Sequence, residues 1–228
     1  MNRSYNGHNA CEEALMKASP LTPLWILLGI VVLFAFVIYF GLRLRNASFA
    51  KNRDIRAQDI WPSLQGTNWD FANLLYGVWQ DFSATEFGLI VKNSRDEEAG
   101  VIVFHTGVRQ RWLTFEAGGS AFEADVLATF RQSVALHSAG DSSQVLCVFN
   151  NARSGIFRFD AKGVGVLESK VPRGLRMAPL YEYTLDGQPV GICQHIGRWM
   201  DRGSYQILPA NIPLAIRMFI LAIQKQRS

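Results

Sequence analysis

The chain has 228 residues, of which 49% are hydrophobic and 18% are charged. This composition excludes disorder over most of the length and allows one domain of ordinary size with a short additional segment. The net charge of +4 lies at the start of the chain. Residues 1–56 hold seven Lys and Arg against three Asp and Glu, whereas residues 57–228 hold sixteen of each. Since the second part carries no basic stripe, nucleic-acid binding is not indicated.

The three cysteines, Cys11, Cys147 and Cys193, are too few and too widely spaced for a disulfide framework. A reducing compartment is the setting that fits them best.

The first element along the chain is a run of 25 uncharged residues between Lys17 and Arg43. About 20 apolar residues in a helix cross a hydrocarbon core of about 30 Å. We therefore expect a transmembrane helix over residues 23–42, preceded by a non-cytoplasmic segment, residues 1–22. The alternatives are a buried core helix and a cleaved signal peptide, whose apolar region is shorter and preceded by basic residues.

A basic flank follows the apolar run, in a juxtamembrane linker expected over residues 43–70. Lys and Arg on the trailing side keep that side in the cytoplasm. We expect a single-pass protein of the plasma (inner) membrane with its N-terminus outside and its C-terminal domain cytoplasmic. Either these side chains only set the topology, or they also attract anionic lipid headgroups. The candidates for headgroup binding are Arg43, Arg45, Lys51, Arg53 and Arg56.

The domain of residues 71–228 begins with short, regularly spaced apolar runs separated by turn residues, a pattern typical of antiparallel strands. Asp186-Gly187 is among the strongest hairpin signals. About ten to twelve strands are expected, in a sandwich or a barrel. The expected strands are residues 87–92, 100–105, 110–116, 121–130, 131–137, 144–150, 155–159, 164–170, 180–184, 189–196 and 203–208.

The chain ends in a different pattern. Asn211 and Pro213 are helix-start signals, and residues 212–223 are apolar apart from Pro213 and Arg217. A helix that is apolar around its whole girth is buried or lies in a membrane. This one is too short to span a bilayer, so a helix threaded through a β-barrel is expected, with re-entrant insertion as the alternative. Arg217 is expected to have a partner or to reach a barrel mouth.

The serial hairpins of residues 87–196, the terminal segment of residues 208–223 and the hairpin of residues 180–191 together give a recognisable pattern. It resembles the tubby C-terminal-like superfamily, which includes tubby, the LURP-one-related proteins and the phospholipid scramblases. The resemblance implies a mainly β fold, with a barrel of about 12 antiparallel strands closed around a C-terminal hydrophobic helix. It also implies non-catalytic work at membranes. The N-terminal anchor departs from the family pattern, and so does the balanced charge of residues 57–228.

Other candidate chemistry is sparse. Cys193 and His195 share one face of an expected strand, but two ligands do not make a zinc site, and we expect neither a metal nor a cofactor. The spacing of the carboxylates Glu116, Glu123 and Asp125 does not by itself indicate acid–base catalysis. Three arginine pairs beside loops are either phosphate-binding or ordinary surface charge: Arg109 with Arg111, Arg173 with Arg176, and Arg198 with Arg202.

The sequence thus favours a membrane-anchored, non-catalytic binding module that senses anionic lipid or docks a protein at the cytoplasmic leaflet. The alternative is a structural or assembly subunit of a larger membrane protein complex.

Overall fold

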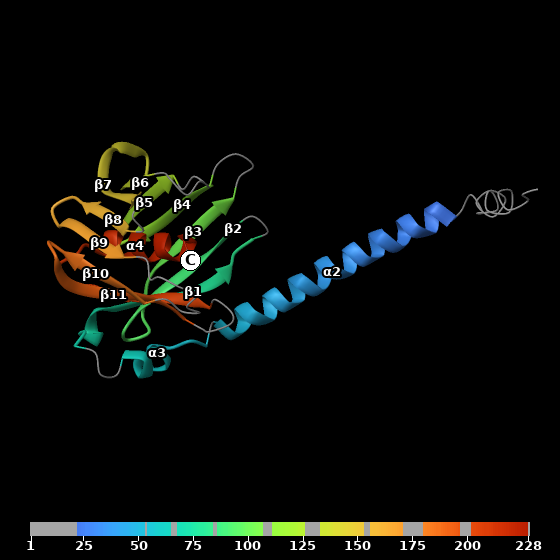
Figure 1. Ribbon diagram of the computed structural model, residues 1–228, viewed down its shortest axis with the longest axis horizontal. Helices are drawn as coiled ribbons and strands as arrows, with labels where there is room; N and C mark the ends of the chain where they lie inside the picture. The colour runs from blue at the N-terminus through green and yellow to red at the C-terminus, as the bar shows by residue number, and fades with distance from the viewer. Residues whose placement is uncertain are drawn as a thin grey trace, which may run out of the picture. The chain divides into compact units, whose positions relative to one another are not determined.

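The structure of the chain is a computed structural model, and its ribbon is drawn in Figure 1. It describes residues 22–52, 54–64, 68–83, 86–106, 111–125, 133–152, 156–170, 180–196 and 202–227. The chain divides into two compact units, Met1–Ala47 and Ser48–Ser228. Each unit is described by itself.

The second unit is built on a closed barrel of twelve antiparallel strands, and this confirms the expected mainly β fold. Each strand pairs with its neighbours in sequence, and β1 pairs with β12 to close the ring, with Leu74 opposite Ile207. The strands are β1 (Leu74–Asp81), β2 (Glu86–Asn93), β3 (Glu98–Thr106), β4 (Arg111–Ala117), β5 (Ser120–Asp125), β6 (Val134–Ser138), β7 (Asp141–Ala152), β8 (Ile156–Ala161), β9 (Gly165–Lys170), β10 (Leu180–Leu185), β11 (Gln188–Ile196) and β12 (Gly203–Ile207).

Turn chemistry sets the hairpins where the sequence predicted them. Asp186 and Gly187 connect β10 to β11 with φ of 51° and 79°, the left-handed conformation that matches the twist of a two-residue hairpin. Strand β1 was not among the expected strands. Its residues Leu74 to Val78 are all buried, so it lacks the alternation that marks a half-exposed strand.

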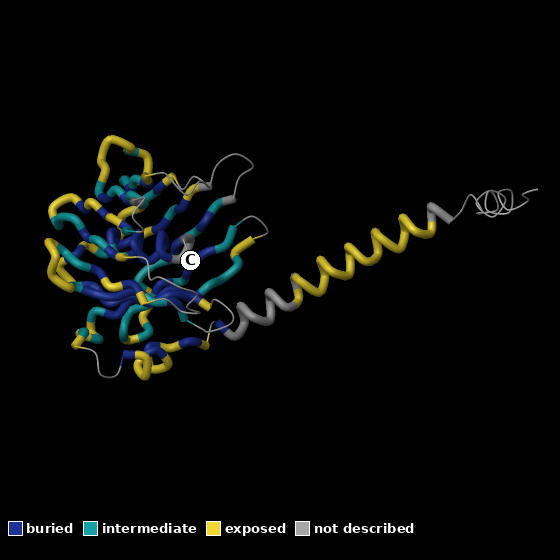
Figure 2. The backbone as a smooth tube through the Cα atoms, viewed as in Figure 1, coloured by how far each residue is buried: buried dark blue, intermediate teal, exposed yellow. Residues whose placement is uncertain are grey.

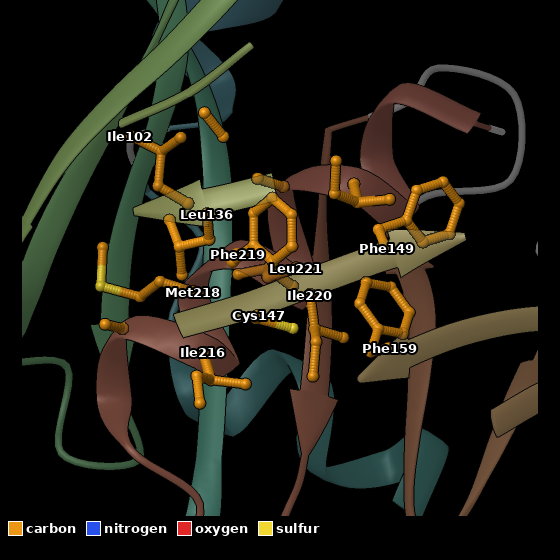
Figure 3. Packing of buried hydrophobic residues seen from close by; sticks show 14 of the residues in the cluster. Ile102, Leu136, Cys147, Phe149, Phe159, Ile216, Met218, Phe219, Ile220 and Leu221 are labelled. Carbon is orange, nitrogen blue, oxygen red and sulfur yellow. The ribbon is translucent and has the colours of Figure 1, made fainter. Parts of the chain in front are cut away.

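Helix α4 (Leu214–Arg227) supplies much of the barrel's core. Its residues from Met218 to Gln224 are 0% exposed. The ring of Phe219 meets that of Phe159 on β8 edge to face, with centroids 6.2 Å apart (Figure 3). On the other side of the barrel, a Cβ at Gly77 of β1 would lie 3.2 Å from Leu221. The helix expected over residues 212–223 is therefore present and buried.

A second, smaller core lies on the outer face of β1, β12 and β11. Helix α3 (Ala57–Leu64) buries Ala57, Ile60 and Leu64 there. Their partners are the outward side chains of the three strands, such as Tyr76 and Tyr205. The stretch 43–70, expected to be a linker, thus contains a helix packed on the barrel. A short 3-10 helix, η1 (Phe71–Asn73), leads from this region into β1.

Helix α2 (Thr22–Asn52) includes the predicted helical segment of residues 23–42 and continues beyond it. The large apolar side chains from Trp25 to Phe40 are 47–66% exposed, and Figure 2 shows this part of the tube as exposed. Among the helices of the described residues, none combines the length and the apolar character needed to cross a membrane. The transmembrane assignment of residues 23–42 stays a prediction.

Candidate functional site

The five basic residues expected to meet headgroups have different places in the chain. Arg43 lies on α2 and is exposed. Arg45 and Lys51 belong to the same helix, but their side chains lie outside the described part, as does the whole of Arg53. Arg56 is exposed at the start of α3, where its N–H donates to the Asp59 carboxylate over 2.9 Å.

Arg56 lines a pocket of about 400 Å³ together with Asp54, Lys92 and Asp96. Asp54 and Arg56 come from the segment before α3, whereas Lys92 stands near the end of β2 and Asp96 in the turn that follows. The pocket thus joins residues far apart in the sequence, two of them basic and two acidic. Sequence reasoning identified Arg56 but missed the other three, because only the packing of α3 on the barrel brings them together.

Asp96 fastens the start of α3 to the barrel. One of its carboxylate oxygens, Oδ1, accepts a hydrogen bond from the Tyr76 hydroxyl at 2.5 Å and another from the Ala57 N–H at 2.7 Å. The Tyr76 hydroxyl also lies 3.5 Å from the Ile55 carbonyl. We call the contact between Asp96, Tyr76 and Ala57 the latch, since it links the first turn of α3 to β1 and to the β2–β3 turn.

The latch depends on an unusual backbone conformation. Asp96 has φ of 64°, in the left-handed region, and the turn is held by Asn93, whose side-chain oxygen accepts from the N–H groups of Arg95 and Glu97. Aspartate tolerates this conformation better than most residues, because its short polar side chain can hydrogen-bond locally. The turn therefore aims the Asp96 carboxylate at α3.

The charge state of the latch follows from its surroundings. Burial alone would raise the pKa of the Asp96 carboxyl. The hydrogen bonds from Tyr76 and Ala57, with the positive charges of Lys92 and Arg56, outweigh this effect, and the pKa lies below its usual value. Burial, followed by the hydrogen bond to Asp96, raises the pKa of the Tyr76 phenol. An ionised carboxylate thus faces a protonated phenol near neutral pH.

The pocket presents charged groups of both signs. Asp96 is already engaged in the latch, and Asp54, Arg56 and the partly exposed Lys92 remain to meet a ligand. Two cations can hold a phosphate group, and a carboxylate beside them can hold an amine.

The arginine pairs beside loops are only partly described. Arg109, Arg173, Arg176 and Arg198 lie outside the described residues. Arg111 begins β4 and Arg202 directly precedes β12, two strands that start at the same end of the barrel.

Cys193 and His195 both lie buried on β11, more deeply than a half-buried strand pair would be. Burial raises the pKa of the Cys193 thiol, which disfavours the thiolate that binds metals. Among the described residues, no group of three or more His, Cys, Asp and Glu side chains is placed to hold a metal ion.

The carboxylates Glu116, Glu123 and Asp125 lie on β4 and β5. Glu123 stands 3.5 Å from His137 Nδ1 and accepts a hydrogen bond from the Gly140 N–H at 3.1 Å. Glu116 and Asp125 are exposed.

One arrangement had no signal in the sequence. His105 on β3 lies between the Glu86 carboxylate, 3.2 Å from Nδ1, and the Thr114 hydroxyl, 2.8 Å from Nε2. Its ring stacks on Trp112 with centroids 4.8 Å apart. The three polar residues come from β2, β3 and β4, and strand register alone brings Glu86 opposite His105.

Comparison with known proteins gave no relative: no family model, no curated protein and no solved structure matches this chain.

Proposed function

We propose that this chain is a membrane-anchored, non-catalytic binding module, in which α2 associates with lipid and the pocket beside α3 binds a lipid headgroup. The observation that carries the proposal is the meeting of Arg56 and Lys92 in one pocket at the start of α3. The pocket lies only a few residues after the end of α2.

The exposed surface of α2 supports the anchoring part of the proposal. Its large apolar side chains from Trp25 to Phe40 are each at least 47% exposed. Exposing so much apolar surface to water is unfavourable by about 25 cal/mol for each Å², and acyl chains would remove that cost. Arg43 and the basic residues after it then favour placing the barrel on the cytoplasmic side of the plasma (inner) membrane, with the N-terminus outside.

The charge balance of the pocket narrows the headgroup class. Two cations and two carboxylates leave no net charge, which disfavours a polyphosphate. A headgroup carrying a phosphate and an amine satisfies both signs, the phosphate at Arg56 and Lys92 and the amine at Asp54. Phosphatidylserine fits this class and is the anionic lipid that we propose.

Binding of glycerophosphoserine to the detergent-solubilised full chain tests the proposal by titration calorimetry. Arg56→Gln and Lys92→Gln should each weaken binding about tenfold, the loss of one charge-assisted hydrogen bond of about 1.4 kcal/mol. Lys162→Gln is the matched control, since Lys162 is an exposed cation in the β8–β9 turn. Equal losses in the control, or no binding by the unaltered protein at moderate salt, would refute the headgroup site.

The anchoring is tested separately, by extracting membranes that contain the full chain with alkaline carbonate. Retention in the lipid fraction is expected, and release would contradict anchoring by α2. A reporter after Ser228 should be active in the cytoplasm, and activity only outside would contradict the orientation. A stoichiometric protein that co-purifies and protects α2 would instead favour an assembly subunit.

We also propose that the barrel has a tubby-like architecture with α4 along its axis. The contacts of α4 with Phe159 on β8, Gly100 on β3 and Gly77 on β1 support this placement, because these strands are spread around the closed ring. An experimental structure superposed on a tubby domain tests it, and a different strand order would contradict the relationship.

A further inference from the structure

The inner wall of the barrel has two chemically different sectors. From β2 to β8 the buried inward side chains are apolar, as in Leu113, Leu136 and Phe149. Over β9 to β12 polar groups join the apolar core, which there still includes Leu167 of β9. On β12, Ser204 and Gln206 alternate with Tyr205 and Ile207, which belong to the outer core, so the two polar residues face inward. We call these residues the polar sector: Ser169, Tyr181, Tyr183, Cys193, His195, Ser204 and Gln206, all at most 8% exposed.

Strand register makes the polar sector continuous. Ser204 lies opposite His195, and Gln206 lies opposite Cys193, which in turn faces Tyr181 on β10. Since directly opposed residues have Cβ atoms about 5 Å apart, these side chains form one connected patch of the wall.

Helix α4 meets the polar sector with polar groups of its own. The Gln224 amide donates to the Tyr183 hydroxyl, and the Gln206 amide donates to the Arg217 carbonyl over 2.6 Å. Gln224 is 0% exposed, so this side of the helix is polar and closed off from bulk solvent.

These two bonds leave much of the hydrogen-bonding capacity of the polar sector unused. The hydroxyls of Ser169 and Ser204, and the side-chain oxygens of Gln206 and Gln224, have no hydrogen-bond partner in the described part of the chain. All four residues are at most 1% exposed. Folded proteins pair the great majority of their buried polar atoms, with protein groups or with bound molecules.

The chemistry of the unpaired groups indicates which kind of molecule could supply their missing hydrogen bonds. An amide oxygen only accepts hydrogen bonds, so an anion would be repelled by both glutamines. None of the seven residues of the polar sector is a carboxylate, and Arg217 lies on the same helix as Gln224, so a cation is disfavoured too. A small neutral molecule that donates to the amide oxygens and exchanges hydrogen bonds with the hydroxyls fits all four groups.

We propose that the polar sector is an internal water-binding site, in which ordered water molecules bridge α4 to β9–β12. Buried waters with about three hydrogen bonds each are regular parts of globular proteins. Helix α4 then contacts β2–β8 directly through apolar side chains, whereas bound water molecules mediate its contact with β9–β12.

Oxygen-17 magnetic relaxation dispersion of the detergent-solubilised full chain tests the proposal, since it counts waters held longer than the protein takes to tumble. Ser204→Ala and Ser169→Ala each remove one hydroxyl with little change in volume, and each should lower the count by about one molecule. Ser143→Ala is the control, because Ser143 is exposed in β7, and it should leave the count unchanged.

The proposal is overturned if the unaltered chain holds no long-lived water, or if both interior variants keep the full count. An equal fall in Ser143→Ala would overturn it as well. Circular dichroism and the thermal midpoint check that each variant is folded, and if one variant fails to fold, the other still decides the outcome.

Discussion

Helices α2 and α4 have similar apolar compositions and opposite surroundings. From Met218 to Gln224 every residue of α4 is 0% exposed, because strands on several sides of the barrel cover it. In α2 the large apolar side chains from Trp25 to Phe40 are at least 47% exposed. The comparison teaches that an apolar helix does not specify its own environment. The barrel covers one helix, whereas the large apolar side chains of the other are exposed.

The largest expected effect would break this comparison at α4. Phe219→Ala removes a 0% exposed ring that packs edge to face on Phe159, so the free energy of unfolding should fall by about 3–5 kcal/mol. Denaturant titration of the full chain measures it. The matched change Phe36→Ala in α2 should leave unfolding of the barrel unchanged, because Phe36 is 61% exposed. Equal losses would show that α2 also belongs to the barrel's core.

The next largest effect is expected at the latch, which holds the start of α3 on the barrel. Asp96→Ala leaves the Tyr76 hydroxyl and the Ala57 N–H without their shared acceptor, at a cost of about 1–3 kcal/mol. Glu98→Ala, an exposed carboxylate in the next strand, is the control and should cost less than about 0.5 kcal/mol.

The loss of stability caused by Asp96→Ala should depend on pH in a defined direction. The pKa of Asp96 is lower in the folded state, so its contribution to stability is present above the unfolded pKa of about 3.9. That contribution is lost as pH falls through the folded value. The difference in the free energy of unfolding between the unaltered protein and Asp96→Ala should therefore be constant from neutral pH to about pH 5. It should become smaller in more acidic solution. A difference that grows in acid would contradict the conclusion that the Asp96 carboxylate is ionised in the latch.

A smaller effect is expected where α3 meets β12. The Tyr205 hydroxyl accepts from the Ser63 hydroxyl at 3.2 Å and donates to the Gln194 side-chain oxygen at 2.5 Å. Tyr205→Phe should destabilise the barrel by about 1 kcal/mol, measured by chemical denaturation. Tyr39→Phe, whose ring is exposed on α2, should show no loss, and a comparable loss there would contradict the assignment.

The smallest change is expected at Arg217, the one charged residue expected within the apolar terminal helix. Its guanidinium is partly buried, burial lowers its pKa, and its Nε has no partner among the described residues. Arg217→Met replaces a poorly satisfied charge with an apolar group of similar length, so the thermal midpoint should stay the same or rise slightly. A clear fall in the midpoint would show that Arg217 has a stabilising partner.

Much of the barrel could be predicted because its hairpins carry local signals. Asp186-Gly187 and Gly118-Gly119 mark turns through backbone conformations that few other residues adopt. The buried terminal helix could be predicted from its apolar girth. Strand β1 could not, because α3 covers its outer face and α4 its inner one, and burial on both faces removes alternation.

Sequence reasoning identified only one of the four residues that line the candidate pocket. Arg56 could be identified from the basic flank after the apolar run. Lys92 and Asp96 read as ordinary charges in a hairpin turn, and their role depends on a left-handed Asp96 and on the docking of α3. Such a site arises from tertiary packing, and the sequence pattern around each residue contains no trace of it.

The outer core under α3 has a consequence for the order of events during synthesis. Residues from Ile55 to Leu64 leave the ribosome early, but their partners Ile192, Tyr205 and Ile207 are among the last to be made. The ring closes only when β12 pairs with β1, so both contacts wait for almost the whole chain. A nascent or truncated chain would therefore already hold the apolar surface of α2 while the outer core under α3 was still incomplete.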